Sequence, residues 1–305
     1  MSAFDQGQRF ELEPGGAARR RDGRPVLVRG RVVGAAPEGR APRPHVVAVH
    51  GYLTSQSWGF FPLLANALAA RGIATVLFDL SGGGVSGRDA DAPWALDDEV
   101  GFATNTYAQE LDDLAAVTEL VRSGSVPGVD RERAGLIGHS RGAAVALVHA
   151  SEVGGYRALA SWSAGGHVGR YEPERLRAWQ ENGVLDVRLG DGRVWHLERD
   201  LFHDFTRHAT RYDLAAAARR YDGPWLLVSG GRDRATTPLE VRTFVQSVER
   251  DRIAPTELRV IEGAGHNFGA RADTWREVER DGDAALRPSL REALDATLDF
   301  FERAL

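Results

Sequence analysis

Short apolar runs alternate with helical patterns along most of this chain, and this alternation restricts its fold more than any other feature. The runs are rich in Val, Ile and Leu and cover residues 45–50, 73–80, 134–139, 158–163, 225–230 and 257–263. Buried strands separated by helices are typical of a largely parallel β-sheet with helices on both faces. We therefore predict an α/β protein with a mostly parallel central sheet.

The segments between the runs carry signals for helix ends. Gly72 closes a predicted helix, and Thr237 with Glu240 forms a capping box at the start of another. Ser289 and Glu292 repeat the same pattern, so the last helix is also predicted to begin at a capping box.

Two regions depart from the alternation. Residues 9–14 and 24–34 read as an antiparallel hairpin added to the sheet edge, and 164–213 interrupts the strand–helix order. The Gly-Asp-Gly at 190–192 lies between alternating residues and predicts a hairpin there. We interpret 164–213 as an inserted cap, with 1–163 and 214–305 as the core.

Composition excludes several kinds of chemistry. The 305 residues contain no cysteine, and because lysine is also absent, all 38 basic residues are arginines. Disulfides, thiolate nucleophiles, Fe–S clusters, cysteine-ligated zinc and lysine-based catalysis are therefore impossible. A net charge of -5 gives no general attraction to nucleic acid.

Nothing in the sequence directs the chain to a membrane. No apolar run reaches the roughly 18 residues that a spanning helix needs. The first residues lack the basic start and apolar core of a secretory signal. We expect a cytoplasmic protein.

A Gly-x-Ser-x-Gly motif supplies the first candidate for catalysis. Gly138-His139-Ser140-Arg141-Gly142 follows an apolar run and precedes a predicted buried helix. In that context the serine sits on a tight strand-to-helix turn with its hydroxyl exposed above the sheet. We predict that Ser140 is a nucleophile; an ordinary turn serine is the alternative.

Two further residues complete a possible triad. His266 follows the last predicted strand, and Asp233 follows the strand before it, so both would emerge at the same sheet edge as Ser140. Asp213 and Asp222 precede that strand and lie at the opposite end. The alternative for Asp233 is a surface carboxylate paired with a neighbouring arginine.

These motifs resemble those of α/β-hydrolase-fold serine esterases, in the branch with cinnamoyl/feruloyl esterases and dienelactone-hydrolase-like or monoglyceride-lipase-like enzymes. The resemblance rests on the segments 49–56, 78–87, 138–144, 231–238 and 263–268. It implies Ser140 as nucleophile, Asp233 as orienting acid and His266 as general base. It also implies an oxyanion hole from the backbone N–H groups of Tyr52 and Arg141, and no metal or organic cofactor.

A competing motif is Gly82 to Gly87, which satisfies the Gly-x-Gly-x-x-Gly pattern of dinucleotide sites. An acidic stretch broken by Pro93 follows it, rather than a helix that could hold a pyrophosphate. We therefore expect a turn at this position and not a nucleotide site.

The substrate pocket is less constrained by the sequence. We expect the Arg141 side chain to pair with a carboxylate and brace neighbouring loops, with contact to a substrate carboxylate as the alternative. Aromatic residues of the cap would mostly pack it onto the core, and any that reach the pocket favour an apolar or aromatic acyl group. The residues predicted to line the pocket are His50, Trp162, Trp179, Trp195 and Phe202.

The combined prediction is a serine hydrolase that cleaves small or medium carboxylic esters through an acyl-Ser140 intermediate. An amidase, a peptidase or a C–C-bond hydrolase would use the same residues, and a non-catalytic binding protein could share the fold. The expected partner is a small-molecule ester. The sequence leaves the oligomeric state open.

Overall fold

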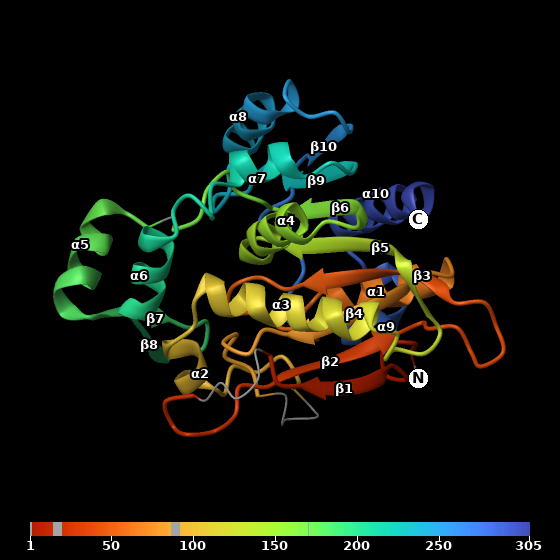
Figure 1. The fold of residues 1–305 in the computed structure, drawn as a ribbon, viewed down its shortest axis with the longest axis horizontal. Helices are drawn as coiled ribbons and strands as arrows, with labels where there is room; N and C mark the ends of the chain where they lie inside the picture. Colours follow the sequence, from red (N-terminus) through yellow and green to blue (C-terminus); the bar gives the residue numbers. More distant parts are fainter. Residues whose placement is uncertain (1, 15–19, 87–91, 170) are drawn as a thin grey trace.

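The computed structural model describes residues 2–14, 20–86, 92–169 and 171–305, and its centre is a β-sheet of eight strands. Figure 1 shows this sheet with helices packed around it. The strands are β1 (Gln8–Leu12), β2 (Val28–Val33), β3 (Arg43–Val49), β4 (Ala74–Asp79), β5 (Val129–His139), β6 (Tyr156–Trp162), β9 (Trp225–Gly230) and β10 (Thr256–Ile261).

The order of the strands is β1-β2-β4-β3-β5-β6-β9-β10. From β4 to β10 all neighbours are parallel, whereas β1 pairs with β2 and β2 with β4 in antiparallel fashion. Both the mostly parallel sheet and the N-terminal hairpin at its edge are therefore confirmed.

Helices cover both faces because successive strand residues point to opposite sides. In β3, Val47 and Val49 belong to one buried cluster, and Val46 and Ala48 belong to another. The first cluster includes α3 (Tyr107–Arg122), α4 (Arg141–Val153), α7 (Leu214–Arg220) and α8 (Pro238–Glu249). The second includes α1 (Phe61–Ala70), α9 (Thr274–Asp281) and α10 (Pro288–Ala304).

One predicted helix start is confirmed and one is wrong. The Thr237 hydroxyl accepts a hydrogen bond from the Glu240 N–H at 3.3 Å, so α8 has the expected cap. Helix α10 begins at Pro288 instead of after Ser289, and its N-cap residue is Arg287. The Ser289 hydroxyl donates to the Phe268 carbonyl at 2.8 Å, which ties the helix to the preceding loop.

The segment 164–213 contains α5 (Pro173–Asn182), β7 (Val184–Arg188), β8 (Val194–Glu198) and α6 (Arg199–Arg207). Strands β7 and β8 form a separate antiparallel sheet, as the Gly-Asp-Gly turn predicted. In Figure 1 these elements lie together at the left, beyond the end of the main sheet. Trp195 of β8 packs against Phe102 of α2 (Glu99–Ala103), with ring centroids 5.3 Å apart.

The described residues after β4 show no helix of the kind that a nucleotide site would need. Residues 81–84 form turns and bends, and no helix occurs among the described residues between β4 and α2. Gly87 and the residues up to 91 lie outside the described residues. Across the described ranges, no helix is both long and apolar enough to cross a membrane.

Candidate active site

Ser140 occupies the sharp corner between β5 and α4, as the Gly-x-Ser-x-Gly motif predicted. Its φ of 53° and ψ of -118° are strained for a residue with a side chain. A Cβ on Gly138 would lie 2.3 Å from the Gly142 carbonyl oxygen, and one on Gly142 would lie 2.2 Å from the His50 carbonyl oxygen. Both glycines are therefore required because the backbone passes too close for any side chain.

His266 and Asp233 reach Ser140 from the loops after β10 and β9. The His266 Nε2 lies 2.9 Å from the Ser140 Oγ, and the His266 Nδ1 lies 2.7 Å from an Asp233 carboxylate oxygen. The structure thus brings the three residues into one hydrogen-bonded chain. Parallel strands produce this meeting because their carboxyl ends share one edge of the sheet.

The Asp233 carboxylate is buried but well supplied with donors. Its second oxygen accepts from the backbone N–H groups of Ala235 at 2.8 Å and Thr236 at 2.9 Å. Burial alone would raise the pKa of Asp233, but the hydrogen bonds from His266, Thr236 and Ala235 outweigh it and lower the pKa below its ordinary value. Asp233 therefore remains ionised at neutral pH and can hold a proton on His266 Nδ1.

A second histidine packs against His266. The His139 ring is buried with its centroid 5.2 Å from that of His266. Burial, followed by the repulsion expected from a charged His266, lowers the pKa of His139 to about 3. His139 is therefore neutral near pH 7. The Ser163 hydroxyl donates to the His266 carbonyl at 2.7 Å, which fixes the loop from the other side.

The chain passes close to Ser140 at the two residues predicted to form an oxyanion hole, Tyr52 and Arg141. Arg141 is the first residue of α4, and a Cβ on Gly51 would approach the Ser140 Cβ within 3.3 Å, so the chain before Tyr52 passes close to the serine. The backbone N–H of neither residue donates to a backbone acceptor within the described part of the chain. Such free donors at a helix N-terminus suit a developing negative charge.

A pocket of 420 Å³ opens at this place. It is lined by Tyr52, Tyr107, Ser140, Arg141, Ala144, Ser163, Gly165, His167, Tyr171, Ala235, Thr236 and His266. The core supplies most of these residues, while the segment 164–213 contributes Gly165, His167 and Tyr171.

None of the five residues predicted to line the pocket is among the described residues that line it. His50 is buried, where its Nε2 accepts from the Leu80 N–H at 2.9 Å and its Nδ1 faces the Gly51 carbonyl at 2.9 Å. Trp162 is buried in the second cluster and donates to the Thr297 hydroxyl at 2.8 Å. Both side chains therefore form hydrogen bonds in the interior and do not reach the pocket.

Of the three cap aromatics predicted for the pocket, Trp179 and Phe202 pack inside the cap and Trp195 packs onto α2 of the core. Trp179 is fully buried, donates to the Leu197 carbonyl at 3.0 Å and meets Phe202 with ring centroids 5.9 Å apart. Trp195 packs against Phe102. Trp179 still contacts the pocket indirectly, because its ring lies edge-on to Tyr171 at 5.2 Å.

The Arg141 side chain pairs with a carboxylate, in agreement with the bracing interpretation. Its Nε lies 2.8 and 3.0 Å from the two Glu110 oxygens, and Asn105 donates to the same carboxylate at 2.6 Å. Both charged side chains are more than nine-tenths buried. The Arg141 guanidinium stacks over the Tyr107 ring, with its central carbon 4.2 Å from the ring centroid.

Sequence reasoning did not assign Glu110 to the site, nor several residues that line the pocket, among them Tyr107, His167 and Tyr171. A signal for Glu110 and Tyr107 existed in α3, where both follow the spacing of the buried helix face that includes Leu111 and Leu114. A carboxylate within an apolar stripe requires a buried cation as its partner. No comparable signal marks Tyr171, since its position depends on how the cap packs.

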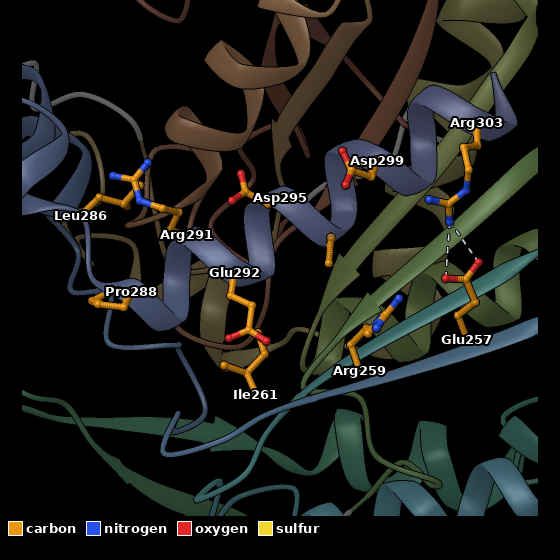
Figure 2. A pocket seen from close by; sticks show the side chains of 11 residues that line it. Glu257, Arg259, Ile261, Leu286, Pro288, Arg291, Glu292, Asp295, Asp299 and Arg303 are labelled. Carbon is orange, nitrogen blue, oxygen red and sulfur yellow. Dashed lines mark hydrogen bonds and ion pairs between the residues drawn. The ribbon is translucent and has the colours of Figure 1, made fainter.

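A second hollow, of 630 Å³, lies between β10 and α10 and is shown in Figure 2. Its walls carry charged side chains, and Glu257 pairs with Arg303 across it at 3.1 Å. It shares no described lining residue with the pocket at Ser140. No group of three or more His, Asp or Glu side chains in the described ranges is arranged to hold a metal ion.

Residues 46–280 match the model of the Alpha/beta hydrolase family. This match covers more than half of the chain. The chain belongs to that family. The resemblance inferred from the motifs around Ser140, Asp233 and His266 is therefore confirmed for family and fold, and membership of this family supports hydrolase activity.

Solved structures show the same fold at low sequence identity. Est1E from Butyrivibrio proteoclasticus is 16% identical, with a TM-score of 0.64 and 98% of each chain covered. GrgF, an alpha/beta hydrolase from Penicillium, is 17% identical, with a TM-score of 0.64 and 97% and 99% of the two chains covered. A puromycin-hydrolyzing peptidase from Mycobacterium tuberculosis is 18% identical, with a TM-score of 0.63 over 99% of this chain and 40% of its own. No curated protein has a matching sequence.

Proposed function

We propose that the protein is a serine hydrolase that cleaves carboxylic esters of small or medium size. The observation that carries the proposal is the hydrogen-bonded chain from Asp233 through His266 to Ser140 at the mouth of a pocket. Nucleophile, base and orienting acid in this geometry are the arrangement needed for acyl transfer.

In the proposed reaction His266 Nε2 accepts the proton of Ser140 while Oγ attacks the ester carbonyl carbon. The negative charge that develops on the carbonyl oxygen is stabilised by the N–H groups of Tyr52 and Arg141. The C–O bond to the alcohol then breaks, and His266 returns its proton to the departing oxygen. Water repeats these steps on the acyl-serine and releases the acid.

Asp233 contributes through His266 rather than through the substrate. Its carboxylate holds the proton on Nδ1, so that Nε2 presents its lone pair to Ser140. The same carboxylate stabilises the imidazolium that forms during each half of the reaction.

Amide hydrolysis is the second candidate. The puromycin-hydrolyzing peptidase shares the fold over nearly the whole of this chain, and amide cleavage needs the same three residues. Two series of substrates with the same acyl groups, p-nitrophenyl esters and p-nitroanilides of increasing chain length, distinguish the candidates. We expect the esters to have the higher kcat/KM; faster turnover of the matched anilides would instead assign the protein to amide hydrolysis.

A covalent probe tests whether the site is catalytic at all. A fluorophosphonate should label the wild-type protein at Ser140 and should fail to label Ser140→Ala. Ser151→Ala is a matched control, since Ser151 lies on α4 and donates to the Val148 carbonyl at 2.8 Å. The control should label like wild type. If the wild-type protein resists labelling and hydrolyses none of the esters, a non-catalytic binding protein is the better interpretation.

A further inference from the structure

One terminal nitrogen of the Arg141 guanidinium lacks a partner among the described residues. The Arg141 Nε faces both Glu110 oxygens, whereas the Nη2 has no hydrogen-bond partner in the described part of the chain. The side chain is 8% exposed, and its Nη2 is fully buried. A buried donor without an acceptor is costly, and a guanidinium presents its terminal N–H groups as a fork that fits two oxygens.

Tyrosine rings lie against the Arg141 guanidinium. The guanidinium carbon lies 4.2 Å from the centre of the Tyr107 ring and 5.6 Å from that of Tyr52. The Tyr107 hydroxyl is hydrogen-bonded to the backbone of Gly169. Tyr52 and Tyr171 line the same pocket as Arg141 and Ser140.

The two phenols keep their protons at neutral pH. Burial raises the pKa of Tyr171 to about 12 and raises that of Tyr52 further. Their O–H groups therefore stay protonated. The polar groups of Arg141, Tyr52 and Tyr171 on this wall of the pocket are then N–H and O–H donors, so a ligand must offer acceptor oxygens.

The residues at this wall favour an anion over a neutral acceptor. Arg141 is among the described residues that line the pocket, and none of those lining residues is a carboxylate. Glu110, which pairs with the Arg141 Nε, does not line it.

We infer that this wall binds a carboxylate of the substrate, held by the Nη2 of Arg141 and the hydroxyls of Tyr52 and Tyr171. The preferred substrates are then esters that carry a free carboxylate on the acyl or the alcohol side, such as half-esters of short dicarboxylic acids. The inference rests on the proposed function, since it names the substrate class of the same site. A carboxylate-bearing substrate differs from the apolar or aromatic acyl group that the sequence favoured.

Two pairs of esters test the preference in the wild-type protein. The acyl-side pair is 4-nitrophenyl hydrogen glutarate and its distal methyl ester; the alcohol-side pair is 4-acetoxybenzoate and methyl 4-acetoxybenzoate. Rates measured without protein are subtracted, because the glutarate half-ester also reacts intramolecularly. We expect kcat/KM to be at least tenfold higher for the carboxylate in one pair, as a charged hydrogen-bonding group requires.

The outcomes separate this inference from the function on which it rests. Hydrolysis of the neutral esters with a ratio near one in both pairs overturns the carboxylate site and leaves the serine hydrolase intact. Absence of both ester hydrolysis and fluorophosphonate labelling overturns the proposed function, and the site must then be judged by binding alone.

Binding is measured with Ser140→Ala, which cannot turn the ligand over. Monomethyl glutarate should bind this variant in calorimetry, and dimethyl glutarate should bind at least tenfold more weakly. Equal affinity for the two compounds contradicts a carboxylate site, whether or not the protein is an esterase.

Conservative variants identify the groups responsible. Tyr171→Phe and Tyr52→Phe each remove one hydroxyl, and each should lower the ratio of kcat/KM for the carboxylate ester to that for its neutral partner about tenfold. Tyr156→Phe is the matched control, since Tyr156 is buried away from the pocket and hydrogen-bonded to Thr118. A control that lowers the ratio as far as Tyr171→Phe would show a structural effect and contradict the assignment.

Arg141 requires a paired substitution. Arg141→Met alone would strand the buried Glu110 carboxylate, so it is combined with Glu110→Gln. The backbone N–H of residue 141 is retained, and the double variant should lose about a hundredfold in the same ratio. A ratio unchanged in a folded double variant rules Arg141 out as the carboxylate ligand.

Discussion

The loops that hold Ser140, Asp233 and His266 and the segment 164–213 border the same pocket, but they are built on different principles. The three loop residues follow β5, β9 and β10, whose relative positions are set by the hydrogen bonds of the sheet. The segment 164–213 instead packs around its own aromatic side chains, with Trp179 at their centre.

This difference explains which predictions succeeded. A residue that directly follows a parallel strand must emerge at a known edge of the sheet, so its position can be inferred from the sequence. A residue on a cap helix reaches the pocket only if the helix turns that face inward. Trp179 and Phe202 were predicted for the pocket, but each packs onto the other side chains of the cap.

The largest effect is expected at the sheet edge, from Asp233→Asn. The amide can still accept from the Ala235 and Thr236 N–H groups, but it favours the wrong tautomer of His266. We expect kcat for p-nitrophenyl esters to fall about 10⁴-fold, with little change in the unfolding midpoint. Asp222→Asn is the control, because Asp222 is exposed before β9 at the opposite end, and it should leave kcat unchanged. A loss below tenfold in Asp233→Asn would remove Asp233 from the mechanism.

Two buried tryptophans test whether the cap unfolds apart from the core. Trp162 and Trp179 are both fully buried, in the core and the cap respectively. Trp162→Ala should lower the free energy of global unfolding by about 3–5 kcal/mol. Trp179→Ala should instead increase hydrogen exchange in α5, β7, β8 and α6, with a smaller change in the urea midpoint. Equal shifts in the midpoint would mean that cap and core unfold together.

The sequence predicted the core fold and the meeting of Ser140, His266 and Asp233, but it could not predict the polar wall of the pocket. The spacing of Leu111 and Leu114 indicates the buried face of α3, but Glu110 on the same face was overlooked. Its partner Arg141 was expected to pair with some carboxylate, and periodicity alone does not say which. The start of α10 was also wrong, because a tertiary contact of Ser289 with Phe268 replaced the local cap.

Glycine positions extend the comparison to backbone packing. A Cβ on Gly142 would meet the backbone oxygens of His50 and Val49 at 2.2 and 2.5 Å, and neither strand nor helix can move easily. Gly142→Ala should therefore cost about 3 kcal/mol in unfolding free energy. Gly190→Ala, in the cap hairpin, meets nothing within 4 Å and should leave stability unchanged. A tolerated Gly142→Ala, measured by urea unfolding, would show that the corner at Ser140 can relax.

Acid should destabilise the core through its buried histidines. Burial lowers the pKa of His45 and His149 to about 4 and that of His139 to about 3, whereas in the unfolded chain histidine titrates near 6.5. Between these values the unfolded state binds more protons, so the free energy of unfolding falls as the pH drops below about 6.5.

His149 allows this effect to be measured away from the site. Each such histidine should lower the free energy of unfolding by about 2 kcal/mol between pH 7.5 and pH 5. Urea unfolding at the two pH values measures this difference. His149→Gln can still contact the Thr118 and Tyr156 hydroxyls, which lie 3.0 and 3.1 Å from the His149 Nε2. The variant His149→Gln should therefore reduce the loss of unfolding free energy at pH 5 by about 2 kcal/mol. His196→Gln, at an exposed cap position, should reproduce the wild-type loss. If the two variants respond alike, the acid sensitivity does not come from buried core histidines, and cap and core would be equally sensitive to protonation.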